Sequence, residues 1–107
     1  MLETIDATLL RIHLAEGDKS HGHPAYEVIV KKAREAGLAG ATVLRGPLGF
    51  GHSMKVHTAK ILQLSENLPM VIEIIDQPDK IESFISVVNG VLEGGLVTME
   101  KVRIVKR

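Results

Sequence analysis

The sequence contains no cysteine and no tryptophan, and aromatic residues make up only 3% of its 107 residues. The absence of cysteine excludes disulfide bonds and thiolate chemistry. The scarcity of aromatic rings disfavours a stacking platform for single-stranded nucleic acid. Thirteen basic residues balance thirteen acidic ones, so a strongly basic nucleic-acid-binding domain is excluded as well. We therefore expect no nucleic-acid partner.

Long apolar runs are also missing, because no stretch approaches the roughly 18 residues that a membrane-spanning helix needs. Residues 1–6 are acidic and lack the basic start of a signal peptide. We therefore expect a cytoplasmic protein. With 45% hydrophobic residues, the chain is long enough for a single domain over residues 1–107 with a core of its own.

The first half of the chain predicts a strand, a helix and a second strand. Over residues 7–15, Leu10, Ile12 and Leu14 alternate with Leu9, Arg11 and His13, and this period of two is typical of a strand. Turn residues cluster at 17–20. Pro24 suits the start of an amphipathic helix that Gly37 ends. A short strand follows at 41–45.

The second half predicts a central strand, a second helix and a last strand. Residues 70–75 are nearly all apolar, as is typical of a central strand, and Pro69 suits its beginning. A helix starts at 76–79, and its apolar residues recur at helical spacing until Gly94. Residues 96–105 are rich in Val, Ile and Thr and form the last strand. Residues 53–67 are expected to be part strand and part exposed loop.

This order of elements predicts an α+β fold. Two right-handed strand–helix–strand units side by side give a ferredoxin-like βαββαβ sandwich, an antiparallel sheet with both helices on one face. The other face then stays bare, and its candidate apolar residues are Val71, Ile75, Val97, Met99 and Val105. We therefore expect the chain to oligomerise through its sheet.

The segment over residues 45–51 (RGPLGFG) is the first candidate ligand site. Glycines let a backbone approach a ligand closely and present amide donors to an anion, and an Arg can clamp a phosphate or carboxylate. The segment is neither a Walker motif nor a dinucleotide fingerprint. A flexible hairpin connection is the alternative interpretation. The candidate ligand-binding residues here are Arg45, Gly46, Gly49, Phe50 and Gly51.

The last strand carries a second candidate, the basic pair Lys101 and Arg103, with Lys106 and Arg107 beyond it. Lys101 and Arg103 are two residues apart, so they lie on one face of the strand. On a terminal strand they can reach a phosphate across a subunit boundary. The alternative is a charged edge that resists aggregation.

Signals for metal binding and catalysis are weaker. His21 and His23 stand near Asp18 and could hold a metal ion, but their spacing is unspecific, as is that of His13, His52 and His57. The run 17–19 could place an acid or base and is equally an ordinary turn. Ser53 lacks the motif of a serine nucleophile. We predict no catalytic residue and no metal site.

Four stretches resemble a known family: residues 23–27 (HPAYE), 33–46 (AREAGLAGATVLRG), 49–51 (GFG) and 68–76 (LPMVIEIID). They are similar to the PII-like proteins of the domain of unknown function 190. The resemblance covers nearly the whole chain and is most specific over residues 34–51. It implies a ferredoxin-like fold and a homotrimer like that of the PII signalling proteins. In those, adenine nucleotides bind in clefts between subunits, beneath a long loop that here falls within residues 46–60.

The resemblance implies a non-enzymatic regulator that binds ADP, ATP or AMP and presents this loop to a partner protein, for example a membrane transporter or channel. Two departures stand out. The only tyrosine is Tyr26 on the first helix, so a tyrosine switch in the loop is absent, and Glu93-Gly94-Gly95 carries no adjacent lysine. Two alternatives stay open. One is a metal-binding trimer, resembling the cation-tolerance proteins, that uses His21, His23 or His52. The other is a small enzyme with an intersubunit site.

Overall fold

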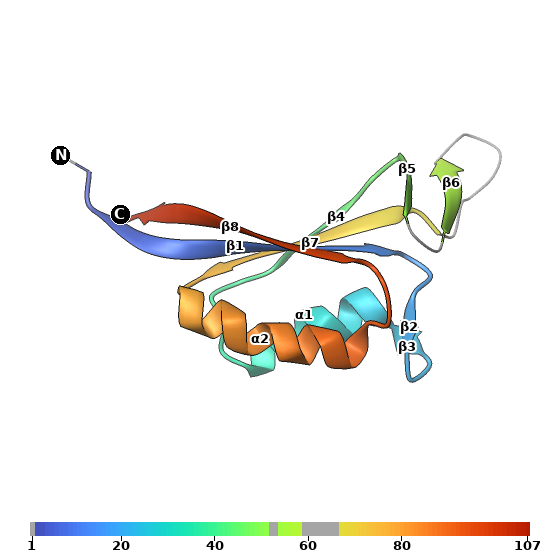
Figure 1. Ribbon diagram of the computed structural model, residues 1–107, viewed down its shortest axis with the longest axis horizontal. Coiled ribbons are helices and arrows are strands. Elements are labelled where there is room, and N and C mark those ends of the chain that lie inside the picture. Colours follow the sequence, from blue (N-terminus) through green and yellow to red (C-terminus); the bar gives the residue numbers. More distant parts are fainter. Residues whose placement is uncertain (1, 52–53, 59–66) are drawn as a thin grey trace.

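Two helices cover one face of a four-stranded antiparallel sheet in the computed structural model, which describes residues 2–51, 54–58 and 67–107 (Figure 1). The sheet strands are β1 (Thr4–Ala15), β4 (Thr42–Arg45), β7 (Pro69–Asp76) and β8 (Leu96–Val105). Their spatial order is β4-β7-β1-β8. The helices are α1 (Ala25–Glu35) and α2 (Pro78–Val91). This arrangement confirms the predicted α+β, ferredoxin-like sandwich.

The core lies between the sheet and the helices. Leu10 and Ile12 of β1 are fully buried, and the register sets them beside Ile74 and Ile72 of β7. The helices supply the opposite layer of buried side chains, which are Ile29, Ala33, Ile81, Phe84 and Val88. Burying one such large side chain contributes roughly 1.5–3 kcal/mol. The apolar residues that recur with a period of two in β1 and at helical spacing in α2 therefore pack against each other in one core layer.

A local signal in the sequence sets the end of α1, and a buried carboxylate orders the backbone just before α2. Gly37 has a φ of +78°, its N–H donates to the Arg34 carbonyl, and the Leu38 N–H donates to the Ala33 carbonyl. This pair of bonds is a Schellman motif, which favours glycine at the left-handed position. At α2, the buried Asp76 carboxylate accepts the N–H groups of Ala39 and Gln77, at 2.9 and 2.7 Å. No helix in the described part of the chain has the length and hydropathy that crossing a bilayer requires.

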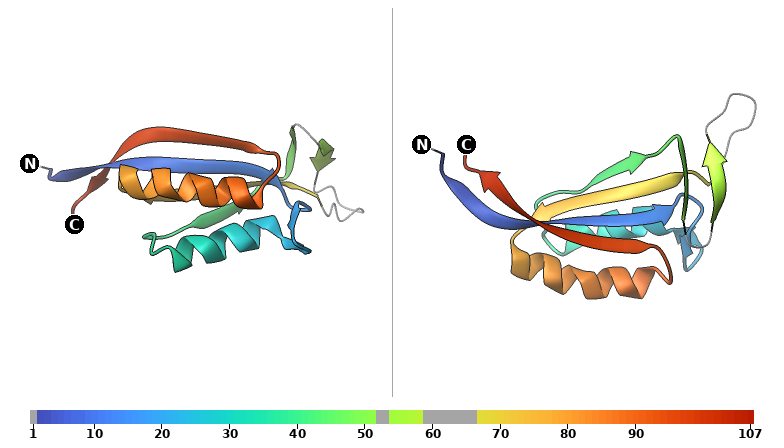
Figure 2. Two further views of the ribbon diagram at one scale, coloured as in Figure 1. Left: turned by 60° about the horizontal axis from the view of Figure 1, so that its bottom comes forward. Right: turned by 45° about the horizontal axis from the view of Figure 1, so that its top comes forward.

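Two small hairpins interrupt the predicted order. β2 (Lys19–Ser20) and β3 (His23–Pro24) are joined by His21 and Gly22, whose φ angles of +50° and +81° suit a type I′ turn. β5 (Leu48–Gly51) pairs with β6 (Met54–Thr58) in the connection between β4 and β7. The expected strand within residues 53–67 is β6, and the rest of that stretch lies outside the described residues. Figure 2 shows the β5–β6 hairpin at one end of the sheet and both chain termini at the other.

The uncovered sheet face is partly as predicted. Val71 and Ile75 lie on it, since they stand opposite His13 and Leu9 of β1. The assignment of Val97, Met99 and Val105 to this face is wrong: Met99 stands opposite Leu10, so these three residues share the helix side, where Val97 packs against the core. The exposed apolar residues on the bare face are Ile5, Leu44, Ile75, Leu96 and Ile104.

Candidate ligand-binding site

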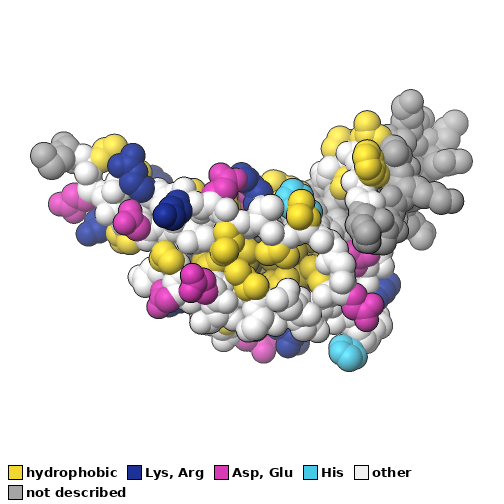
Figure 3. Space-filling view, viewed as in Figure 1, with side chains coloured by type: hydrophobic (Ala, Val, Ile, Leu, Met, Phe, Trp, Pro, Cys, Tyr) yellow, Lys and Arg dark blue, Asp and Glu magenta, His cyan; other side chains and the backbone are white. Residues whose placement is uncertain are grey.

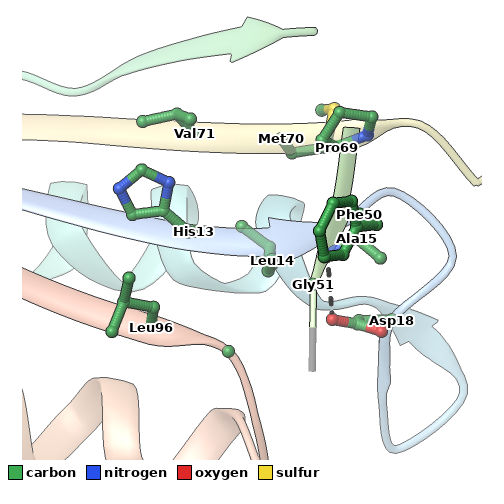
Figure 4. A pocket seen from close by; sticks show the side chains of 11 residues that line it. His13, Leu14, Ala15, Asp18, Phe50, Gly51, Pro69, Met70, Val71 and Leu96 are labelled. Carbon is green, nitrogen blue, oxygen red and sulfur yellow. Dashed lines mark hydrogen bonds between the residues drawn. The ribbon is translucent and has the colours of Figure 1, made fainter. Parts of the chain in front are cut away.

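A cavity of about 490 Å³ opens at the end of the sheet where the β5–β6 hairpin stands. Val71, His13 and Leu96 form a row across β7, β1 and β8, and Phe50 and Gly51 come from β5. Figure 4 shows these side chains together with Asp18. Leu14, Ala15, Pro69, Met70 and Gly95 complete the lining. The volume lies within the range of small-molecule sites, and the walls are mainly apolar with two polar side chains.

Phe50 is 75% exposed, so its ring is available to a ligand or a partner. Gly51 lines the cavity beside it. Both are candidates from the sequence, and the structure brings them together at one site. An exposed aromatic ring next to a cavity is suited to stacking against a flat ligand.

Gly46 and Gly49 pack against Pro69 at the base of the hairpin. A Cβ added to Gly49 would lie 2.9 Å from Pro69 Cγ, and one added to Gly46 would lie 3.0 Å from the same atom. The Gly46 N–H donates to the Pro69 carbonyl at 2.8 Å. Within the described residues these glycines therefore hold β5 close to β7. The predicted role of these amides as anion donors does not hold for Gly46, because its N–H already has a protein acceptor.

Arg45 ends β4 and forms an ion pair with Glu16, whose carboxylate oxygen lies 2.5 Å from the Arg45 Nη2 atom. Glu16 follows β1, and its N–H donates to the Leu68 carbonyl. The Arg45 side chain is 56% exposed and does not line the cavity of Phe50. Arg45 therefore connects the hairpin base to the turn after β1.

The two basic candidates on β8 lie at the opposite end of the sheet. Lys101 stands opposite Thr8, and Arg103 stands opposite Asp6. They line a second hollow of about 650 Å³ together with Pro78 and Glu82 of α2. Seven residues of β1 separate Asp6 from His13, which corresponds to about 23 Å along the strand. The structure therefore does not bring Lys101 and Arg103 to Phe50 within one chain.

A polar cluster occupies the centre of the bare sheet face. Arg11 Nε donates to Glu73 at 2.8 Å, and Arg11 Nη1 pairs with Glu100. The hydrogen bond to Glu73 and the attraction of both carboxylates raise the pKa of Arg11, with partial desolvation acting against them. One Arg faces two Glu residues, so the cluster carries one surplus negative charge at the centre of the bare face.

Histidines do not gather around a metal in the described part of the chain, where no three His, Asp or Glu side chains are placed to share an ion. His21 occupies the hairpin turn, and His13 lies on the bare sheet face. His52 lies outside the described residues.

Sequence reasoning did not place His13, Asp18 or Leu96 in a ligand cavity, because it considered His13 and Asp18 only for metal binding or acid–base chemistry and did not single out Leu96. Each belongs to a different segment, and only the β1–β8 register and the turn after β1 bring them to the hairpin. The glycine spacing around Phe50 was the one signal that pointed to this end of the sheet.

The fold is PII-like. It superimposes on CPII, a nitrogen regulatory PII-like protein from Thiomonas intermedia K12, with a TM-score of 0.67 at 14% identity over 98% of this chain and 99% of that one. That structure contains ADP, AMP and bicarbonate. A second CPII structure, bound to ADP and bicarbonate, also has a TM-score of 0.67, at 16% identity over 99% of this chain and 95% of that one.

The sequence places the chain within a family. Residues 7–104 match the model of DUF190, described as an uncharacterized ACR, and the chain belongs to this family. It is 36% identical to a UPF0166 protein of Aquifex aeolicus, over 97% of this chain and 98% of the relative. It is 42% identical to a UPF0166 protein of Methanocaldococcus jannaschii, over 72% and 70% of the two chains. The family membership confirms the resemblance seen in the sequence.

Proposed function

We propose that this protein is a non-enzymatic regulator that binds an adenine nucleotide (ADP, ATP or AMP) between the subunits of a homotrimer. The cavity beside Phe50 and Gly51 takes part of the nucleotide, and Lys101 and Arg103 of a neighbouring copy bind its phosphates. The connection over residues 46–60 then presents a surface to a partner protein, for which a membrane transporter or channel is one candidate. The fold shared with nucleotide-bound CPII supports the ligand class.

The observation that carries the proposal is the separation of the two candidate groups. An apolar cavity with an exposed aromatic ring lies at one end of the sheet, and Lys101 and Arg103 stand opposite β1 residues that lie about 17 and about 23 Å from His13 along the strand. A nucleotide needs both an apolar contact for its base and positive charge for its phosphates. The described part of one chain does not supply both at one place, but two adjacent copies do so when the hairpin end of one meets the β8 end of the next.

The surface offers room for such a neighbour. β8 is an edge strand of ten residues whose outer backbone groups have no strand beside them among the described residues. Figure 3 shows apolar side chains in the hollow between this edge and α2. Exposed edges of this kind readily pair with another chain. A second copy on this flank would cover Met99, which is 52% exposed, and bring its own segment close to Lys101 and Arg103.

Ligand binding would reach the partner surface through β5. Phe50 belongs both to the cavity wall and to the exposed face of the hairpin, where Leu48 is 62% exposed. A ligand that contacts Phe50 in only one hairpin conformation stabilises that conformation by its differential affinity. The partner protein would then recognise the hairpin in its ligand-bound arrangement.

Calorimetric titration with ADP, ATP and AMP, on protein whose mass in solution is measured in parallel, tests this function. We expect a trimer with one nucleotide per chain and a loss of affinity of at least about tenfold in Arg103→Ala, because a charge-assisted contact is removed. Arg107→Ala is the matched control, since it removes the same charge from the exposed chain end. A monomer, or a trimer without measurable nucleotide binding, would contradict the proposal.

A further inference from the structure

The cavity beside Phe50 has the wrong charge for a phosphate. Its described lining holds one carboxylate, Asp18, and one imidazole, His13, but neither Lys nor Arg. A phosphate placed there would face a carboxylate with no Lys or Arg among the described lining residues to offset it. The uncharged nucleoside end is therefore the part that fits this cavity, and the phosphates point out of it.

Asp18 is held in place by three hydrogen bonds. Its N–H donates to the Ala15 carbonyl at 3.0 Å, its carbonyl accepts the Ala25 N–H at 2.8 Å, and its Oδ2 atom accepts the Ala15 N–H at 3.0 Å. Figure 4 shows this last bond at the β5 end of the cavity. Among the described residues Oδ1 accepts no hydrogen bond. The fold thus fixes an acceptor-only group at the cavity wall.

An ionised carboxylate accepts hydrogen bonds and cannot donate one, so it selects ligands that carry N–H or O–H groups. Adenine presents an exocyclic amino group at its six-position, and hypoxanthine presents a carbonyl oxygen there. The amino group would donate to Asp18, whereas the carbonyl oxygen would be repelled by it. Phe50 supplies an exposed ring against which either flat base can stack, so Phe50 does not discriminate between the two bases.

We infer that Asp18 is a specificity-determining residue that selects an amino-bearing purine, with the base lying in the cavity between Phe50 and the Val71–His13–Leu96 row. This inference rests on the proposed nucleotide-binding function. It adds the orientation of the nucleotide and identifies the side chain that recognises its base. It assigns a role to a turn residue that otherwise only connects β1 to β2.

The test compares ADP with IDP, two nucleotides that share ribose and phosphates and differ in the base. Calorimetry on the wild-type protein should give an affinity for ADP about tenfold higher than for IDP, as loss of one hydrogen bond to a charged group predicts. In Asp18→Asn, the Asn Oδ1 atom can still accept the Ala15 N–H, while its amide nitrogen now donates toward the cavity. The affinity for ADP should therefore fall, the affinity for IDP should rise, and the preference for ADP over IDP should disappear.

Glu35→Gln is the matched control, because it removes one negative charge at the exposed end of α1, far from the cavity, and should leave both affinities unchanged. The assignment of Asp18 would be overturned if D18N still preferred ADP over IDP. It would also be overturned if D18N lost affinity for ADP and IDP equally. Equal wild-type affinities would overturn it as well, even if D18N does not fold. Absence of binding by both nucleotides would overturn the proposed function itself.

Discussion

Gly95 lies against the backbone of His13 at the edge of the cavity. A Cβ added to Gly95 would come within 2.6 Å of the His13 carbonyl oxygen, and the φ of Gly95 is +87°. Steric overlap and a left-handed backbone both exclude a side chain here. The turn between α2 and β8 therefore brings the start of β8, including Leu96, against β1 at the hairpin end of the sheet.

The replacement Gly95→Ala should destabilise the protein by about 1–3 kcal/mol, because the backbone must leave its native conformation to relieve the overlap. Chemical denaturation monitored by circular dichroism measures the change. Gly90→Ala is the matched control. Gly90 lies within α2 and an added Cβ meets nothing within 4 Å, so this variant should gain about 0.5–1 kcal/mol. Equal stabilities of the two variants would show that the close approach does not exist.

Gly49→Ala should alter ligand binding more than folding. Its Cβ would press on Pro69 and shift β5, which carries Phe50, while the core between the sheet and the helices stays intact. We expect a several-fold loss of ADP affinity with an unfolding midpoint close to that of the wild type. Gly40→Ala, where the added Cβ meets nothing within 4 Å, is the control. Unchanged ADP affinity in Gly49→Ala would show that ADP binding does not depend on the position of β5.

Arg11→Gln should weaken the trimer. The replacement leaves Glu73 and Glu100 without their cation on the bare sheet face, through which the sequence predicts that the chain oligomerises, and burying unpaired carboxylates is costly. Sedimentation velocity at decreasing protein concentration measures the assembly. The double variant Arg11→Gln/Glu73→Gln, with one carboxylate fewer, should recover part of it. A trimer as tight in Arg11→Gln as in the wild type would place this cluster outside the interface.

The same cluster predicts little change in assembly between neutral and mildly alkaline pH. Hydrogen bonding to Glu73 raises the pKa of Arg11 above its ordinary, already strongly alkaline value. A raised pKa means that the stabilisation by the charged form is complete below the unfolded-state pKa and is lost only as the pH rises through the folded-state pKa. Sedimentation at neutral and mildly alkaline pH should therefore give the same association constant. A marked weakening at mildly alkaline pH would point to another titrating group.

Much of the fold could be predicted because single segments carry strong periodic signals. The alternation around Leu10 and Ile12 identified β1, and the apolar run after Pro69 identified β7. The side of β8 that faces the helices could not be predicted, because it depends on the register that sets Met99 opposite Leu10. A shift of one residue would exchange the two faces.

The candidate site was less predictable. The glycines beside Phe50 pointed to the end of the sheet that holds the cavity, but the structure packs Gly46 and Gly49 against Pro69. The sequence indicates for Asp18 an ordinary turn, an acid or base, or a metal ligand, and does not indicate a place beside a ligand cavity. Only the fold places it next to a cavity whose other walls come from β1, β5, β7 and β8.

A mixing experiment tests the shared site most directly. Phe50→Ala and Arg103→Ala should each bind ADP weakly, because each removes one half of every site. If two copies build each site, random trimers formed from an equal mixture of the two variants regain about one intact site in four. Recovery of that fraction of wild-type ADP binding after co-refolding is the predicted result. No recovery in mixed trimers would mean that the two halves never meet, and would contradict the account.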